Sequence, residues 1–127
     1  MRLFTKTLMT GNYSSPNFAQ ISVQELAKCL SASDNKLQLV DVREPQEVDI
    51  ASIDGFVNLP LSEFANWDQQ IHSRFEHNSE TLVLCHHGVR SAQMCQWLVA
   101  QGFTNVKNIS GGIDAYSRMV DHSIPQY

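Results

Sequence analysis

Apolar residues in this chain gather in short runs, separated by segments that repeat apolar positions at helical spacing. Residues 37–42 and 81–84 are almost continuous apolar runs, as expected for strands buried on both faces of a sheet. Residues 55–59 and 106–109 predict two more short strands, and Pro60 stops the first of these. The chain therefore contains at least four predicted strands.

The segments between these runs predict helices. Ser22 and Glu25 form a capping box before the first helix, and Gly102 stops the third. In chain order, the predicted helices cover residues 23–30, 61–75, 91–101 and 111–119. Strands that alternate with helices predict a parallel sheet covered on both faces, and ligands of such sheets bind beyond the carboxyl ends of the strands.

The chain has 127 residues, which predicts about one ordinary domain. Residues 11–17 are rich in turn formers and lack periodicity, so we predict a loosely held arm over residues 1–17 and a folded domain over residues 18–127. With 43% hydrophobic residues, the domain can bury a core without help from a disulfide or a metal.

Charge and cysteine content narrow the possible partners and the compartment. The formal net charge is −4 and the basic residues are scattered, so we expect no nucleic-acid partner. We also expect no membrane partner, because no apolar stretch is long enough to cross a bilayer. Residues 1–10 lack the apolar block of a signal peptide, and three cysteines do not make a disulfide framework. These features predict a cytoplasmic protein.

The strongest chemical signal follows the apolar run 81–84. Cys85 stands at the end of this predicted strand, and a predicted helix begins shortly after Arg90. Gly88 can take the positive φ that a tight loop needs, and Arg90 can hold an oxyanion with two hydrogen bonds. The helix start and the arginine both favour a reactive thiolate. The loop groups expected to bind an anion through the backbone are those of His86, His87, Gly88, Val89 and Ser91.

The segment from Cys85 to Ser91 resembles the active-site loop of rhodanese-type sulfurtransferases, in which four residues separate the cysteine from an arginine followed by serine. Residues 39–45, 55–60 and 102–113 resemble other segments of that family in the same order. One departure is Ala51–Ser52, which stand where a Gly-His pair is common. The resemblance implies a three-layer α/β/α fold with a central, mostly parallel five-stranded sheet.

The resemblance also implies a function. A sulfane sulfur would be carried as a persulfide on Cys85, with Arg90 facing the anion. The donor would be a small anionic sulfur compound such as thiosulfate, the acceptor a thiol, cyanide or a protein, and no cofactor is implied. Asp41 and Arg43 follow the first buried run and are expected to make polar contacts behind the loop, with a structural role favoured over a catalytic one.

Other residues with reactive side chains have plainer interpretations. His86 and His87 flank Cys85, but no fourth ligand stands at a recognisable spacing, so no metal site is predicted. Cys29 and Cys95 lie on apolar helix faces and are predicted to be core residues. A resolving thiol at Cys95 is the alternative.

Two other functions compete with sulfur transfer. A cysteine-dependent phosphatase or arsenate reductase would have five residues between the cysteine and the arginine, whereas four stand here, and no loop supplies an evident general acid. A non-catalytic rhodanese-like binding or regulatory module would often lack the cysteine, which is present at Cys85. The sequence therefore favours a thiosulfate sulfurtransferase.

Overall fold

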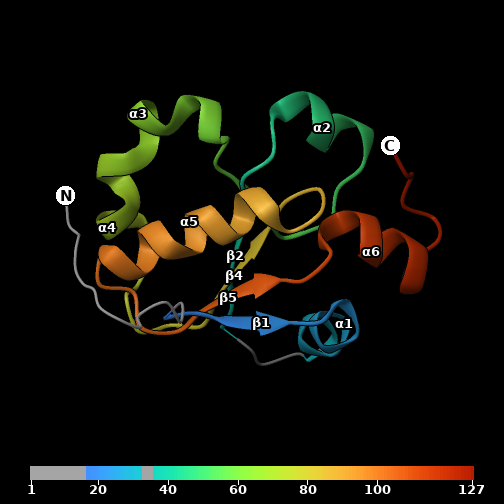
Figure 1. Ribbon diagram of the computed structural model, residues 1–127, viewed down its shortest axis with the longest axis horizontal. Helices are drawn as coiled ribbons and strands as arrows, with labels where there is room; N and C mark the ends of the chain where they lie inside the picture. Colours follow the sequence, from blue (N-terminus) through green and yellow to red (C-terminus); the bar gives the residue numbers. More distant parts are fainter. Residues whose placement is uncertain (1–16, 33–35) are drawn as a thin grey trace, which may run out of the picture.

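The computed structural model describes residues 17–32 and 36–127, so nearly all of the arm predicted for residues 1–17 lies outside the described residues. Five strands form one sheet in the order β1-β5-β4-β2-β3, and every neighbouring pair is parallel. Figure 1 shows the sheet in the middle of the molecule, with helices around it. The strands are β1 (Ala19–Ile21), β2 (Gln38–Asp41), β3 (Val57–Asn58), β4 (Thr81–Leu84) and β5 (Val106–Ile109). The predicted α/β/α fold with a five-stranded parallel sheet is confirmed.

The register of the central strands places the site. Strand β2 pairs with β4 residue by residue, from Gln38 opposite Thr81 to Asp41 opposite Leu84. Because parallel strands end at the same edge, the residues after Asp41 and after Leu84 lie side by side. Cys85 therefore stands next to the β2–α2 connection at the carboxyl edge of the sheet.

The two faces of the sheet are covered by different helices. Side chains alternate along a strand, so Val83 belongs to one apolar cluster while Leu82 and Leu84 belong to the other. Helices α3 (Phe64–Trp67), α4 (Ile71–Arg74) and α5 (Val89–Ala100) pack on the face of Val83. Helices α1 (Val23–Ser31) and α6 (Gly112–Met119) pack on the opposite face. None of the helices in the described ranges is long and apolar enough to span a membrane.

The ends of α1 and α5 follow the sequence signals. The Glu25 backbone N–H donates to the Ser22 Oγ over 3.0 Å, and the Ser22 N–H donates to the Glu25 carboxylate over 3.1 Å, which completes the predicted capping box. Gly102 follows α5 with φ +100°, as its predicted role as a helix stop requires. Helix α5 begins at Val89, two residues earlier than predicted.

The helix predicted over residues 61–75 is broken into short pieces. They are η1 (Leu61–Glu63), α3, η2 (Asp68–Gln70) and α4. Trp67, at the end of α3, is buried, and its indole N–H donates to the Pro60 carbonyl over 2.8 Å. The Trp67 ring also meets the rings of Phe64 and Trp97 edge to face, at centroid distances of 5.1 and 5.8 Å.

Two elements were not predicted. Strand β1 has three residues and one buried side chain, too few for a clear alternation. Helix α2 (Pro45–Ile50) has six residues and none of them is buried, so it has no apolar stripe. The signal that would have found α2 is Pro45 at its first position. Helix α2 carries a residue of the site.

Candidate active site

The sulfur of Cys85 lies at the bottom of the predicted loop. Cys85 follows β4 directly and is 1% exposed. The Gly88 backbone N–H donates to its Sγ over 3.0 Å, and the Ser91 Oγ lies 3.2 Å from the same sulfur. Both groups come from the start of α5, so the positive end of the helix dipole is directed at the sulfur. Two donors and a helix end are suited to stabilise negative charge on Sγ.

A polar residue on β5 supports Ser91. The Ser91 Oγ donates to the Asn108 Oδ1 over 2.5 Å, and both side chains are buried. The Asn108 Nδ2 donates in turn to the Gly88 carbonyl over 3.1 Å. A hydroxyl has one proton, so Ser91 can donate either to Asn108 or to a thiolate on Cys85. Sequence reasoning missed Asn108, whose only signal was a polar residue in an apolar run.

Helix α6 holds the first two peptides of the loop. The Ile113 N–H donates to the Cys85 carbonyl over 2.9 Å, and the Asp114 N–H donates to the His86 carbonyl over 3.0 Å. This approach needs a glycine at position 112, where φ is +63° and a Cβ would overlap both carbonyl oxygens. Gly88, with φ +103°, turns the loop back toward α5 as predicted.

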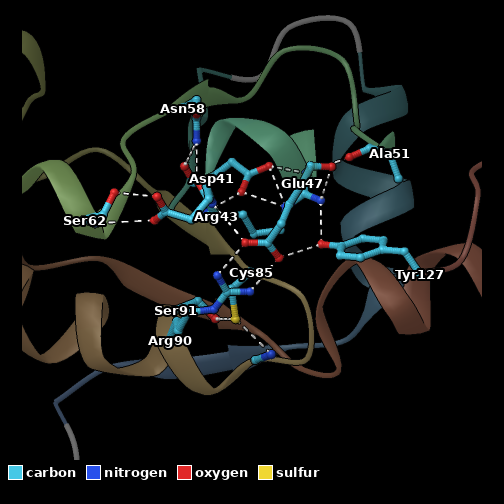
Figure 2. A network of polar contacts seen from close by, with 12 residues as sticks. Asp41, Arg43, Glu47, Ala51, Asn58, Ser62, Cys85, Arg90, Ser91 and Tyr127 are labelled. Atoms are coloured by element: carbon cyan, nitrogen blue, oxygen red, sulfur yellow. Dashed lines mark hydrogen bonds and ion pairs between the residues drawn. The ribbon is translucent and has the colours of Figure 1, made fainter. Parts of the chain in front are cut away.

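Arg90 forms an ion pair that the sequence did not predict. Its Nη1 donates to the Glu47 Oε2 over 2.7 Å and its Nη2 to the Oε1 over 2.9 Å. Figure 2 shows the Glu47 carboxylate facing the guanidinium, which lies between that carboxylate and the Cys85 sulfur in this view. The guanidinium thus bonds to a carboxylate of the protein, and the expected contact of Arg90 with an anionic donor stays a prediction. Sequence reasoning missed Glu47 because it overlooked α2.

The ion pair shifts both ionisation equilibria. The Arg90 guanidinium, ahead of the other contacts of Glu47, lowers the pKa of that carboxyl from its ordinary value of 4.5 to about 2. Glu47 in turn raises the pKa of Arg90. Both groups are therefore charged throughout the neutral range.

Asp41 and Arg43 form the buried support of this arrangement. Arg43 is fully buried, and its Nη2 donates to the Asp41 Oδ2 over 2.7 Å and to the Ala51 carbonyl over 2.8 Å. A third bond runs from the Arg43 Nη1 to the Glu47 carbonyl over 3.3 Å. The pair thus ties α2 to the end of β2, in keeping with the structural role favoured from the sequence.

Tyr127 joins the loop to α2 and was not predicted. Its hydroxyl accepts from the Arg43 Nη1 over 2.8 Å and donates to the Glu47 Oε1 over 3.0 Å. Its ring stacks on His86 with a centroid distance of 3.9 Å and an interplanar angle of 4°. Burial, and then the neighbouring His87, lowers the pKa of His86, so this ring is neutral at pH 7.

The outer rim of the loop is formed by His87 and Val89, which are both exposed. The His87 ring lies 3.9 Å from that of His86, and its Nε2 lies 4.0 Å from the Asp114 carboxylate. Ligand atoms of these two histidines and Asp114 lie within 4.8 Å of one another, a set the sequence could not show because Asp114 comes from α6. The Asp114 carboxylate already pairs with the Arg118 guanidinium at 3.0 Å, which opposes cation binding.

Cys95 is a core residue, as predicted. It is 0% exposed, and burial raises its pKa to about 12. At neutral pH it therefore stays a thiol, which argues against the alternative of a resolving thiol. Cys29 lies on α1 and packs against the cluster on that face of the sheet.

Comparisons with a family model and with known proteins agree on one family. The family model of the rhodanese-like domain matches residues 22–119. A rhodanese-like/PpiC domain-containing protein 12, chloroplastic, from Arabidopsis thaliana is 50% identical over 93 residues, covering 73% of this chain and 31% of that protein. The adenylyltransferase and sulfurtransferase UBA4 of Debaryomyces hansenii is 32% identical over 114 residues, covering 85% of this chain and 25% of that protein. The chain thus spans a third or less of the length of these two relatives.

A solved structure agrees with the fold. The rhodanese-like domain protein from Staphylococcus aureus superposes with a TM-score of 0.69 at 26% identity, and the match covers 87% of this chain and 99% of that one. The family match includes β2, β4, the loop after Cys85 and α6, which are the parts that build the site. The chain belongs to the rhodanese-like domain family.

Proposed function

We propose that this domain is a sulfurtransferase that carries a sulfane sulfur as a persulfide on Cys85. The observation that carries the proposal is the position of the Cys85 Sγ, 3.0 Å from the Gly88 N–H and 3.2 Å from the Ser91 Oγ at the amino end of α5. A relative named as a sulfurtransferase supports the same chemistry.

The reaction has two steps that both use this sulfur. The Cys85 thiolate attacks the sulfane sulfur of the donor, the donor's bond to that sulfur breaks, and the rest of the donor leaves with the electron pair, as sulfite when the donor is thiosulfate. An acceptor thiolate, cyanide or protein thiol then attacks the outer sulfur, and Cys85 leaves as a thiolate. The Gly88 N–H and the Ser91 hydroxyl stabilise the negative charge at each stage.

A turnover assay tests the activity. Cys85→Ser should abolish the formation of thiocyanate from cyanide and a sulfane-sulfur donor, because it removes the sulfur that would carry the transferred atom. Cys29→Ser is the matched control, since Cys29 lies on α1 and should leave turnover unchanged. If the wild-type protein shows no turnover with thiosulfate, a thiosulfonate or a persulfide, the non-catalytic binding module replaces the enzyme as the better proposal.

The compartment and the partners expected for this domain remain predictions. A reducing compartment suits a reactive Cys85 thiol, and the cytoplasm is one such compartment. The word chloroplastic in the name of the Arabidopsis relative applies to that protein. The expectations of no nucleic-acid partner and no membrane partner likewise rest on the sequence alone.

A further inference from the structure

We propose that Glu47 determines the class of sulfur donor: by pairing with Arg90, it makes the site favour persulfides over the dianion thiosulfate. The inference rests on the proposed sulfurtransferase activity and names the substrate class of the same site. Glu47 would act as a specificity-determining residue.

Arg90 is already paired with a carboxylate of the protein. Both terminal nitrogens of its guanidinium donate to the two oxygens of Glu47, at 2.7 and 2.9 Å. This is the two-point geometry with which an arginine would otherwise hold two oxygens of a sulfonate. A donor that needs this arginine must therefore displace a carboxylate.

The Glu47 carboxylate is held firmly in this position. Besides the two bonds from Arg90, the Glu47 carboxylate accepts from the Glu44 N–H over 3.0 Å and from the Tyr127 hydroxyl over 3.0 Å. The backbone of Glu47 is itself tied to the buried Arg43. Four donors on one carboxylate mean that rotating it away from Arg90 breaks several charge-assisted bonds at once.

Two neighbouring arginines are also paired with carboxylates. Arg43 is paired with Asp41 in the interior, and Arg118 is paired with Asp114 at 3.0 Å. His86, next to Cys85, is neutral at pH 7 because burial lowers its pKa. Around the loop, the charges of these arginines are thus matched by carboxylates, and attraction for an anion is left to the backbone and the helix end.

The two donor classes differ in the charge they bring. Thiosulfate enters as a dianion and leaves as sulfite, so both species are repelled by Glu47. A persulfide R–S–SH transfers its outer sulfur to the Cys85 thiolate, its S–S bond breaks, and R–S⁻ leaves and takes up a proton. Both reactions balance without an oxidant or reductant, and the persulfide places less charge beside Glu47.

The test compares two donors of similar shape and different charge. Methanethiosulfonate has a methyl group where thiosulfate has one oxyanion, so it is a monoanion with the same sulfane sulfur. The measured quantity is the ratio of kcat/KM for thiosulfate to kcat/KM for methanethiosulfonate. Glu47→Gln should raise this ratio at least about tenfold, because one negative charge beside the donor is removed.

A matched variant controls for net charge. Glu80→Gln removes the same charge from another ion pair, that with Lys107 at 2.7 Å, at the opposite end of β4 from Cys85. It should leave the ratio within about twofold of wild type, because a distant, partly exposed charge is screened. Intrinsic donor reactivity cancels when the ratios of two proteins are compared.

A second arm uses glutathione persulfide as the probe in place of methanethiosulfonate. Glu47→Gln should raise the ratio of kcat/KM for thiosulfate to kcat/KM for glutathione persulfide at least about tenfold over wild type, because a persulfide group carries at most one negative charge at the reacting sulfurs. An unchanged ratio in a folded Glu47→Gln protein would overturn the role of Glu47. Absence of activity with every donor in the wild type would instead overturn the sulfurtransferase proposal. Should Glu47→Gln not fold, Glu47→Ala and Glu80→Ala are compared by the same ratio.

Discussion

The single proton of the Ser91 hydroxyl lies between two acceptors, the Asn108 Oδ1 at 2.5 Å and the Cys85 sulfur at 3.2 Å. Loss of that hydroxyl would leave a thiolate with one fewer donor in a buried site. We expect Ser91→Ala to lower kcat/KM for sulfur transfer on the order of 10²-fold, as for the loss of one donor to a developing anion. Steady-state kinetics with methanethiosulfonate and cyanide measure this. Wild-type kinetics in a folded Ser91→Ala protein would show that the hydroxyl serves packing alone.

The two buried cysteines should differ in reactivity. Cys95, whose pKa is raised to about 12, has almost no thiolate at pH 8, whereas Cys85 has donors for its anion. We expect iodoacetamide at pH 8 to label Cys85 at least about 100-fold faster than Cys95 under native conditions. Peptide mapping by mass spectrometry gives both rates. Comparable rates would mean that the core around Cys95 opens, or that the loop does not activate Cys85.

At the scale of elements, the contact between α6 and the loop has no room for a side chain. We expect Gly112→Ala to destabilise the domain by about 3 kcal/mol or more, because a Cβ would overlap the Cys85 and His86 carbonyls at a positive φ. Denaturant unfolding measures the loss. Gly102→Ala is the comparison, because its φ is also positive while nothing lies within 4 Å of its Cβ. Equal losses in the two variants would show that backbone strain alone, rather than the loop contact, sets the cost.

The sequence predicted those parts of the site that are contiguous. Cys85, Gly88 and Ser91 lie within one strand-loop-helix unit, so local signals were enough to bring them together. Glu47, Asn108 and Tyr127 come from α2, β5 and the segment after α6, and reach the loop only through the strand order and the packing of the sheet. Strands β2 and β4 were predicted because each lies in an almost continuous apolar run of the sequence. Helix α2 was missed because none of its residues is buried.

At the scale of the whole molecule, the Arg90–Glu47 pair joins α5 to α2 and should make stability depend on pH. The pKa of Glu47 is lowered in the folded state from 4.5 to about 2, so its contribution is complete above about pH 5 and is lost as the pH falls toward 2. We therefore expect Glu47→Gln to lower Tm near pH 7, and the difference from wild type to shrink steadily below pH 4.5. Thermal unfolding followed by circular dichroism across this range measures the difference.

A matched charge removal separates this pair from general acid effects. Glu80→Gln removes one carboxylate from another ion pair, that with Lys107 at 2.7 Å, so it measures how far the loss of any paired carboxylate changes Tm across this pH range. If the Tm difference between wild type and Glu47→Gln were constant from pH 7 to pH 2, the carboxylate would not be stabilised by its contact with Arg90.

The location of the transferred sulfur tests the central claim most directly. The protein is incubated with methanethiosulfonate or glutathione persulfide, and the excess donor is then removed. The intact mass of the protein is measured by mass spectrometry before and after addition of cyanide. We predict a gain of one sulfur atom per chain, mapped to the peptide that contains Cys85 and removed by cyanide. Cys85→Ser should gain none. A sulfur atom found on Cys29 or Cys95, or an adduct that persists in Cys85→Ser, would contradict the account.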